Sequence, residues 1–302
     1  MTFILTLVAS QAPLTAAHIA QVTQYIESNK IGLRGVPDWR ARAKAVDLTI
    51  LSNPSHENIE ALWKILEKDR IDLFVTDTQK RRKKLLLADM DSTIITDETL
   101  DEIAIQIGIG DKVTAITERA MRGELDFSAA LRARVQMLSG HDAALLHNIA
   151  KEITLSPGAS SMISAMRKNG TTCVLVSGGF TFFTEKIAQK TGFHHHHGNI
   201  LEITDSKITG AVADPILDKD TKLALLQKYT QQLNIDLKET MAIGDGANDL
   251  PMLQAAGLGI GYHPKPLLRQ TLNNCILYGD LSAALYAQGY HEEDIIHDRA
   301  AI

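Results

Sequence analysis

The stretch Leu85-Leu86-Leu87-Ala88-Asp89-Met90-Asp91-Ser92-Thr93 decides the fold of this 302-residue chain. Its aliphatic run is typical of a buried strand. Asp89 and Asp91 follow at the carboxyl end, where open α/β sheets bind their ligands. Two carboxylates this close repel each other unless they share a cation or a proton. The stretch therefore predicts a metal site, a proton-transfer pair, or both.

The chain after residue 85 alternates strand-like and helical segments, which predicts an α/β fold with a Rossmann-like parallel sheet. A helical block at 98–151 separates the first two strands, so we expect a cap of about 95–155 over the carboxyl end of the first strand, where it excludes water. Residues 201–212 read as a β-hairpin. The expected strands are 85–89, 172–177, 240–245, 258–261 and 274–277.

Residues 1–80 predict a separate small α+β domain. Strands are expected at 3–9, 46–50 and 71–75, with a further one around 34–39, and helices at 15–28 and 55–66. The polar segment 77–84 is the expected boundary, which leaves 81–302 as the second domain. Its basic tetrad, 81–84, is interpreted as a solvated linker face.

The composition is that of an ordinary globular protein, with 45% hydrophobic and 22% charged residues. A net charge of −5 gives no basic footprint for nucleic acid. No apolar run reaches the roughly 18 residues of a membrane helix, and segment 3–9 lacks the basic start of a signal peptide. Cys173 and Cys275 lie in apolar runs and read as core residues in a reducing compartment. We expect a cytoplasmic enzyme without nucleic-acid or membrane partners.

Two further segments can bind an anion. Ser177-Gly178-Gly179 ends a strand before a helix, and its backbone N–H groups and hydroxyl suit a phosphate. The alternative is a tight turn without a ligand. Lys222, near the start of a helix, supplies a fixed positive charge for a transferring group. By composition alone Lys219 is an equal candidate.

The segment Gly244-Asp245-Gly246-Ala247-Asn248-Asp249 ends another strand. Asp245 can join Asp89 in holding a hard cation through oxygen ligands. Asn248 and Asp249 can orient ligands or bound water, although an N-capping aspartate is the alternative. With Asp89 as nucleophile and Asp91 as acid and base, these segments make a phosphoryl-transfer site.

These motifs resemble the haloacid dehalogenase-like phosphatases over residues 85 to about 290. Asp91 matches the phosphatases of that superfamily and not its dehalogenases. The resemblance extends to the phosphoserine phosphatase family through Asp89–Thr93, Glu98–Ala104, Ser177–Phe180 and Gly244–Asp249. Counting back from Asp245 without a gap puts the family's lysine on Lys222.

The resemblance implies roles for individual residues. Glu98 binds the substrate's amino group and Arg134 its carboxylate, as a zwitterion requires, while Met121 and Phe127 are apolar contacts from the cap. A Mg²⁺ ion is held by Asp89, Asp245 and the backbone carbonyl of Asp91. The phosphate is held by Ser177, the N–H of Gly178 and Lys222, and Asn248 also binds substrate.

The expected reaction converts O-phospho-L-serine and water to L-serine and phosphate through an aspartyl-phosphate, as the last step of serine biosynthesis. One alternative is a phosphatase or phosphotransferase acting on another small phosphate. A second is an amino-acid sensor with a vestigial core. Residues 1–80 resemble ferredoxin-like ACT modules in outline, which implies a regulatory role or a homodimer. The run His194–His197 is interpreted as an exposed loop.

Overall fold

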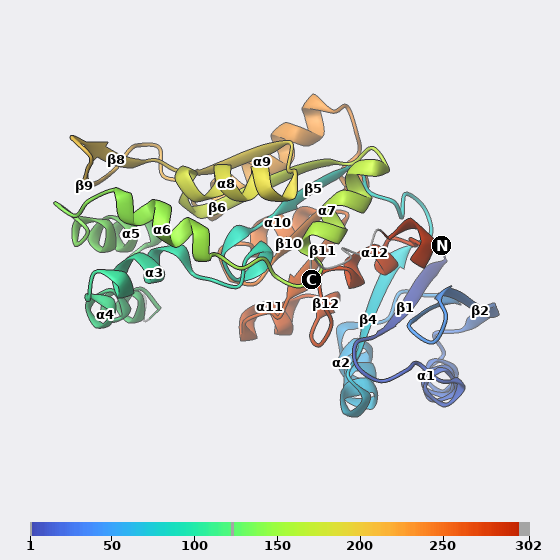
Figure 1. Ribbon diagram of the computed structural model, residues 1–302. Coiled ribbons are helices and arrows are strands. Elements are labelled where there is room, and N and C mark those ends of the chain that lie inside the picture. The colour runs from blue at the N-terminus through green and yellow to red at the C-terminus, as the bar shows by residue number, and fades with distance from the viewer. Residues whose placement is uncertain (1, 122–123, 296–302) are drawn as a thin grey trace.

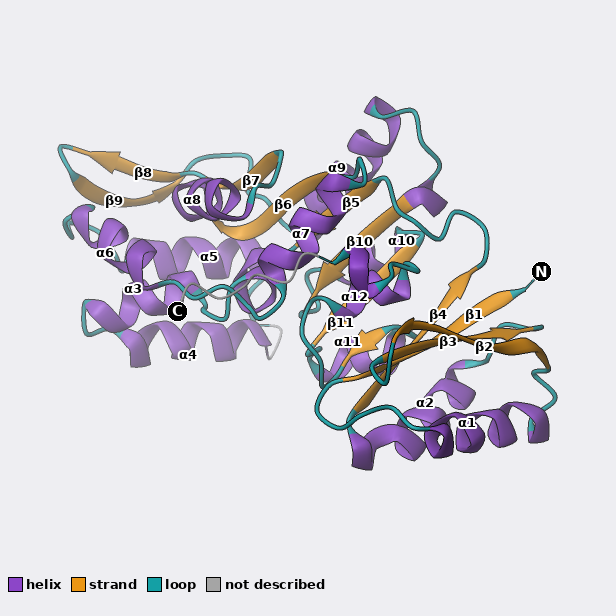
Figure 2. Ribbon diagram, turned by 45° about the vertical axis from the view of Figure 1, so that its right-hand side comes forward, coloured by secondary structure: helices purple, strands orange, loops and turns teal. Residues whose placement is uncertain are grey.

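The protein is described by a computed structural model that covers residues 2–121 and 124–295. Its centre is a parallel sheet with helices on both faces (Figures 1 and 2). The elements of this part are β5 (Leu85–Ala88), α7 (Ala159–Lys168), β6 (Thr172–Phe180), α8 (Thr181–Thr191), β7 (His195–Asn199), α9 (Lys219–Gln232), β10 (Thr240–Gly244), α10 (Leu250–Ala255), β11 (Leu258–Tyr262), α11 (Pro266–Thr271), β12 (Cys275–Ile276) and α12 (Ala283–Ala287).

The predicted α/β class and the five predicted strands of this part are confirmed. The strands lie in the order β12-β11-β10-β5-β6-β7, and every neighbouring pair is parallel. The apolar runs are long because both faces of these strands are covered. The predicted burial of Cys173 and Cys275 is also confirmed, and both thiols are free.

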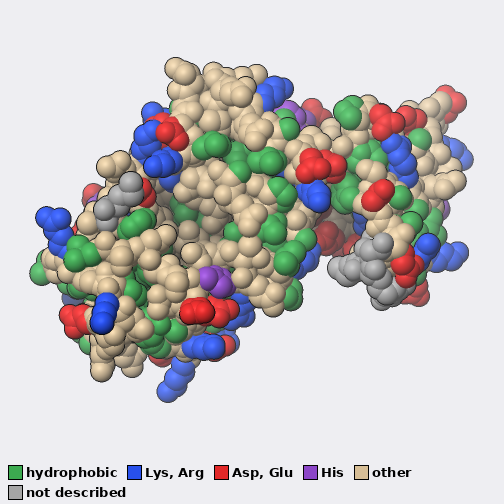
Figure 3. Space-filling view, turned by 180° about the vertical axis from the view of Figure 1, so that it is seen from behind, with side chains coloured by type: hydrophobic (Ala, Val, Ile, Leu, Met, Phe, Trp, Pro, Cys, Tyr) green, Lys and Arg blue, Asp and Glu red, His purple; other side chains and the backbone are tan. Residues whose placement is uncertain are grey.

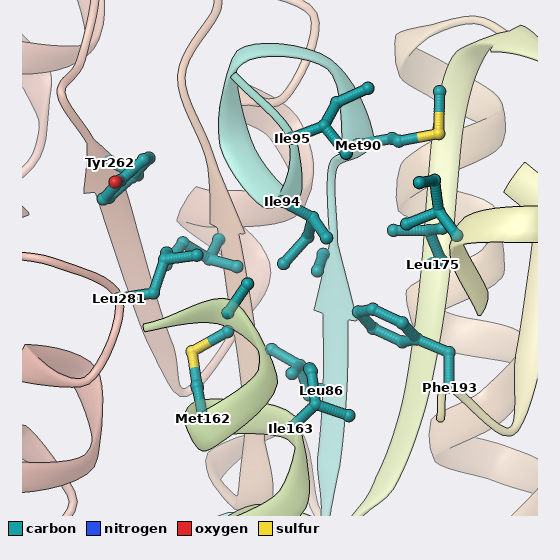
Figure 4. Packing of buried hydrophobic residues seen from close by; sticks show 14 of the residues in the cluster. Leu86, Met90, Ile94, Ile95, Met162, Ile163, Leu175, Phe193, Tyr262 and Leu281 are labelled. Carbon is teal, nitrogen blue, oxygen red and sulfur yellow. The ribbon is translucent and has the colours of Figure 1, made fainter. Parts of the chain in front are cut away.

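Alternate residues of β5 pack on opposite faces of the sheet. Leu86 lies in a cluster with α7, α8 and α12, and Figure 4 shows it beside Ile163 of α7. Leu87 lies in a second cluster with α9, α10 and α11. Each fully buried aliphatic side chain contributes about 2 kcal/mol from burial. This double packing fixes the end of β5, and with it the position of Asp89.

The N-terminal part is an antiparallel sheet with two helices on one face (Figure 2). Its strands lie in the order β2-β3-β1-β4, and β4 pairs with β12 through Leu73 and Cys275. One ten-stranded sheet therefore crosses the expected boundary at residue 80. The elements are β1 (Phe3–Ala9), α1 (Ala16–Ser28), β2 (Leu33–Ala41), β3 (Ala45–Ile50), α2 (His56–Leu66) and β4 (Ile71–Asp77).

The basic tetrad of residues 81–84 is not a solvated face throughout, so that prediction is wrong in part. Arg81 donates to both oxygens of the buried Asp47, at 2.6 and 2.8 Å, and to the carbonyls of Tyr286 and Ala287. The buried Lys83 donates to the carbonyl of Lys238 at 2.6 Å. The segment runs between two packed parts of the chain, so alternate side chains point inward.

Four of the five α-helices that the structure describes between β5 and β6 lie beyond the carboxyl end of β5 and pack beside a β-hairpin (Figures 1 and 2). The chain enters and leaves this helical block through a narrow neck. There Thr96 N donates to Thr154 O at 3.0 Å, and Ser156 N donates to Ile94 O at 2.9 Å. The elements are α3 (Thr99–Gln106), α4 (Gly110–Met121), α5 (Phe127–Gln136), α6 (Ala144–Glu152), β8 (Leu201–Thr204) and β9 (Lys207–Val212).

The interpretation of His194–His197 as an exposed loop is wrong for the last three of these residues, while His194 is exposed and lies outside a strand. His195–His197 begin the edge strand β7, which pairs with β6. The ring of His196 bonds to the hydroxyl of Thr184 at 2.9 Å, and that of His197 to the hydroxyl of Tyr229 at 2.9 Å. Neighbouring side chains of a strand point to opposite faces, so the run does not converge on a common ligand.

The surface carries charges of both signs. On the face shown in Figure 3, acidic and basic side chains are interspersed among apolar ones. Within the described ranges, no helix is both long enough and apolar enough to cross a membrane.

Candidate active site

Three buried carboxylates meet at the carboxyl edge of the parallel sheet. Asp89 follows β5, and its N–H donates to the carbonyl of Ile243 on the neighbouring β10 at 3.0 Å. Asp245 follows β10, and Asp249 lies at the start of α10. Oxygens of the three side chains lie within 4.8 Å of one another. The predicted convergence of Asp89 and Asp245 on one edge thus appears in the structure, and Asp249 joins them.

Lys222 is the cation at the centre of this cluster. Its side chain is 1% exposed. The ammonium donates to Asp89 and, at 2.6 Å, to Asp249. Helix α9 fixes its position, because the Asp218 carboxylate caps the helix by accepting from the N–H of Thr221 at 2.9 Å. Lys219, the other candidate, is exposed. The geometry therefore selects Lys222.

The charges in this cluster shift one another's ionisation. Burial raises the pKa of Asp89 well above its ordinary value, and the nearby Asp249 carboxylate adds to the effect while Lys222 opposes it. Burial alone would lower the pKa of Lys222, but Asp249 and Asp89 raise it. Lys222 is therefore a permanent positive charge, and the cluster still has excess negative charge.

The donor set suits a hard divalent cation. Asp89, Asp245 and Asp249 offer only oxygen atoms, which magnesium and calcium prefer. Lys265 donates to Asp245 at 2.9 Å. The three clustered carboxylates and the nearby Asp91 are therefore accompanied by two lysines, Lys222 and Lys265. A divalent cation would reduce the repulsion between these carboxylates. The residues present fit the metal that the sequence predicts.

The Asp91 carboxylate is separate from this cluster. One oxygen accepts from the N–H of Thr99 at 2.8 Å, and the other accepts from the hydroxyl of Ser177 at 2.8 Å. The turn at 90–94 directs it this way, with Ser92 at a φ of 54°. Asp91 is thus held by two donors beside Asp89. That position suits proton transfer, while the acid's side chain stays out of the carboxylate cluster.

Other groups approach the backbone of the two glycines after Ser177 closely. A Cβ at Gly179 would lie 3.0 Å from Asp91 Oδ2, and one at Gly178 would lie 3.0 Å from the ring of Phe127. The N–H of Gly179 donates to Ser177 Oγ at 2.8 Å. Phe127 begins α5, so it brings the helical block directly over the glycine turn.

Glu98 stands at the start of α3, between the neck and the carboxylate cluster. Its Oε1 accepts from the hydroxyl of Ser92 at 2.7 Å and lies 3.9 Å from the ammonium of Lys265. Enclosure by its surroundings and the nearby Asp91 carboxylate raise the pKa of Glu98. The structure therefore joins Glu98 to Asp245 through a single lysine.

Arg134 lies on α5, two turns after Phe127. Burial lowers the pKa of its guanidinium, while the charges of Asp101 and Glu98 oppose that effect. In the described ranges no carboxylate lies within ion-pair distance of Arg134, whose Nε donates only weakly to Ala130 O at 3.4 Å. Its charge is thus available to a ligand. Met121 ends α4, and its side chain lies outside the described part of the structure.

Asn248 lies in the turn of residues 244–249, and its amide is 3.5 Å from Asp249 Oδ1.

The sequence analysis did not identify two residues of this site, Lys265 and Asn199. Lys265 donates to Asp245. Asn199 donates to the carbonyl of Gly178 at 2.8 Å and accepts from the N–H of Leu217 at 2.7 Å. Lys265 could have been found from the sequence, because it follows β11 at the same edge of the sheet as the other site residues. Asn199 follows the histidine-rich run, and no sequence pattern marks it as a site residue.

Comparisons with known proteins show the family to which the chain belongs. The family model for haloacid dehalogenase-like hydrolases matches residues 86–254. A phosphoserine phosphatase of Streptomyces coelicolor is 39% identical over 216 residues, which are 72% of this chain and 53% of that protein. The phosphoserine phosphatase SerB2 of Mycobacterium tuberculosis is 33% identical over 288 residues, which are 94% of this chain and 70% of that protein. The chain spans about half the length of the first relative.

Two solved structures are also similar. A hydrolase of the same family from Salmonella enterica serovar Typhi has a TM-score of 0.83 and 29% identity, with 99% of each chain covered. A phospho-aspartyl intermediate analogue of phosphoserine phosphatase has a TM-score of 0.64 and 38% identity, with 68% of this chain and 98% of that chain covered. With the family match over more than half of its residues, the chain belongs to the haloacid dehalogenase-like hydrolases.

Proposed function

We propose that the protein is a phosphoserine phosphatase, which hydrolyses O-phospho-L-serine to L-serine and phosphate as the last step of serine biosynthesis. The observation that carries the proposal is the buried Lys222, bonded to Asp89 beside Asp245 and Asp249 at the sheet edge. A nucleophile, a fixed cation and a metal-binding set in one place are what phosphoryl transfer requires. The names of the curated relatives and the phospho-aspartyl analogue support the choice of substrate.

In the first step, the Asp89 carboxylate attacks phosphorus in line and forms an aspartyl-phosphate. Asp91, oriented by Ser177 and Thr99, donates a proton to the departing serine oxygen. Lys222 places its charge beside the nucleophile, where it reduces repulsion between Asp89 and the phosphate. In the second step, the same Asp91 accepts a proton from the attacking water, and the aspartyl-phosphate is hydrolysed.

The proposed metal is Mg²⁺, held by Asp89, Asp245 and the backbone carbonyl of Asp91. Asp249 also lies within reach of this ion, and it accepts a hydrogen bond from the ammonium of Lys222. When bound, the ion neutralises charge on the phosphoryl oxygens. Ser177, the N–H of Gly178, Lys222 and Asn248 are proposed to bind the phosphate.

The proposed substrate specificity comes from two side chains of opposite charge. Glu98 receives the ammonium group and Arg134 the carboxylate of the amino acid. Arg134 lacks a close acidic partner in the described residues, which supports this role. Helices α3–α6 act as the cap, and Phe127, over Gly178, is an apolar contact that keeps water from the site. Met121 is proposed as a second such contact.

The Arg134→Ala variant tests the specificity assignment. We expect kcat/KM for phosphoserine to fall by roughly a hundredfold, because a charge-assisted, bidentate contact to the carboxylate is lost. Hydrolysis of p-nitrophenyl phosphate, which has no carboxylate, should change by less than about threefold. Arg132→Ala is the matched control, since Arg132 lies on the same helix but donates to Val212 O at 3.1 Å. Equal losses with both substrates would contradict the assignment.

Phosphate release from a panel of phosphorylated metabolites tests the function itself. We expect phosphoserine to give the highest kcat/KM, and a chelator to abolish release until Mg²⁺ is restored. A higher rate with another small phosphate, or transfer to an alcohol in place of water, would replace the proposal with the phosphotransferase alternative. Full activity in chelator would remove the metal from the mechanism.

The N-terminal part is proposed to be an ACT-like, ferredoxin-like unit, residues 1–80, that regulates or dimerises the catalytic unit at 81–302. The βαββαβ element order and the sheet order β2-β3-β1-β4 support this assignment. Strand β2 is one of the two edge strands of the ten-stranded sheet, and Val36 on it is 83% exposed. Free edges pair readily with a second copy.

Buried thiols at Cys173 and Cys275 support a cytoplasmic location.

Sedimentation measurements test the proposed homodimer. We expect twice the mass of one chain at micromolar concentration, and a shift to one chain in the Val36→Lys variant, because a lysine on an edge strand opposes pairing. A mass of one chain for the unmodified protein at all concentrations would remove this proposal.

A further inference from the structure

The hydroxyl of Thr99, the first residue of α3, is buried and has no hydrogen-bond partner in the described ranges. The residue is 1% exposed. A threonine inside a helix commonly bonds the carbonyl four residues earlier, but a helix offers no such carbonyl to its own first residue. Burying a hydroxyl without a partner is unfavourable, so the position of this group calls for a functional explanation.

This hydroxyl lies beside the acid and base of the proposed reaction. The backbone N–H of Thr99 donates to Asp91 Oδ1 at 2.8 Å, which ties the two residues together. A Cβ at Gly179 would lie 3.1 Å from Thr99 Oγ1, and 3.0 Å from both Asp91 Oδ2 and Ser177 Oγ. The three side-chain oxygens therefore surround one point. Ser177 Oγ donates to Asp91 Oδ2 and accepts from the N–H of Gly179, so Thr99 Oγ1 is the oxygen of these three that lacks a partner.

The two steps of the proposed reaction present different groups to this hydroxyl. In the second step, the oxygen of water forms a bond to phosphorus, Asp91 takes one proton, and the broken bond leaves its electron pair on the Asp89 carboxylate. The other hydrogen of the water is then free to donate a hydrogen bond. In the first step, the departing serine oxygen carries a carbon in place of that hydrogen. An acceptor beside Asp91 therefore assists the attack by water and not the departure of serine.

We propose that Thr99 Oγ1 accepts a hydrogen bond from the attacking water, and so makes water the preferred acceptor of the phosphoryl group over an alcohol. Asp91 holds one hydrogen of the water and Thr99 the other, which directs a lone pair at phosphorus. An alcohol has carbon in place of the second hydrogen and gains nothing from Thr99. Thr99 is thus a catalytic residue of the second step. The inference rests on the proposed aspartyl-phosphate reaction and adds to it what selects the acceptor.

Competition between water and methanol for the aspartyl-phosphate tests this role. The full chain hydrolyses phosphoserine with Mg²⁺ at a fixed methanol concentration, and phosphorus NMR quantifies methyl phosphate and phosphate. Thr99→Val keeps the shape of the side chain and removes the hydroxyl. We expect it to raise the ratio of methyl phosphate to phosphate by about tenfold, because the lost hydrogen bond slows only the attack by water. Thr99→Ser keeps the hydroxyl and should keep the ratio.

The lifetime of the aspartyl-phosphate is a second readout. In single-turnover experiments, Thr99→Val should form the aspartyl-phosphate within about twofold of the normal rate but hydrolyse it about tenfold more slowly. Its Tm should not fall, since the hydroxyl has no partner to lose in the described ranges. Thr76→Val is the matched control, because Thr76 Oγ1 on β4 is likewise buried without a partner in those ranges. That change should leave the ratio and the lifetime unaltered.

The outcomes separate this inference from the proposed function. If the unmodified chain is phosphorylated on Asp89 but Thr99→Val keeps a normal ratio and lifetime, the role of Thr99 is wrong and the mechanism stands. Equal slowing of both steps would also overturn this role, since it indicates a general disturbance of Asp91. Absence of a phosphorylated intermediate in the unmodified chain would overturn the mechanism and the inference together. If Thr99→Val does not fold, Thr99→Ala also removes the hydroxyl and gives the same comparison.

Discussion

Replacing Asp89 with asparagine should lower kcat for phosphoserine by at least about a thousandfold. An amide does not form the acyl-phosphate, so the first step is lost. The remaining site should stay assembled, because asparagine keeps the size of the side chain and an oxygen that accepts from Lys222. The measurement is steady-state phosphate release, with Tm as the check that the variant is folded.

Asp205→Asn is the matched control for this change. Asp205 lies in the exposed turn of the β8–β9 hairpin with a φ of 50°, which asparagine tolerates well. Its kcat should stay within about twofold of the unmodified chain. If Asp89→Asn retained more than about a tenth of the activity, Asp89 would not be the nucleophile.

The Lys222→Met variant should lose at least about a hundredfold in kcat and also lose stability. The ammonium is the charge next to the transferring phosphoryl group, and such preorganised charges contribute strongly to rate. Its removal also leaves Asp89 and Asp249 buried without their cation, which costs about 3 kcal/mol of unfolding free energy. Denaturant titration measures the second effect, and kcat of the folded fraction measures the first.

Lys219→Met separates this role from a general effect of charge on α9. Lys219 is exposed one turn earlier on the same helix. Its replacement should leave kcat and the unfolding free energy within error. If Lys219→Met were the variant that lost activity, the assignment of Lys222 as the catalytic cation would be wrong.

The sequence predicts this site well where the signals are local. The aliphatic run before Asp89 and the Gly-rich turn after β10 are properties of a few neighbouring residues. In a parallel sheet, the carboxyl ends of strands share one edge, so Asp89, Ser177 and Asp245 follow from these signals once the strands are recognised. The choice between Lys222 and Lys219 required the resemblance, and the burial of Lys222 agrees with it.

The missed features depend on contacts between distant segments. Lys265 acquires its position because β11 lies next to β10, and its partner Glu98 comes from the start of α3. Arg81 looks like part of a charged linker until Asp47, from β3, is brought against it. The histidine run is polar in sequence, yet pairing with β6 makes it a strand. Tertiary contacts outweigh local polarity in each of these cases.

The pairing of the N-terminal strands with the parallel strands also depends on contacts between distant segments. Leu73 of β4 and Cys275 of β12 are separated by some 200 residues, and no local pattern indicates that they pair. The segment after β12 is held by the buried Asp72, which accepts from the N–H groups of Leu277 and Gly279. Burial raises the pKa of this carboxyl to about 6. The N-terminal part is thus bonded to the segment that follows β12.

A covalent phosphate on Asp89 is the central element of the mechanism, and mapping it after a rapid acid quench tests it most directly. The chain is mixed with phosphoserine and Mg²⁺, quenched within one turnover, digested, and analysed by mass spectrometry. We expect the phosphate on the peptide that contains Asp89, and its absence in Asp89→Asn. Phosphate release without any covalent species, or phosphate on a different residue, would contradict the mechanism.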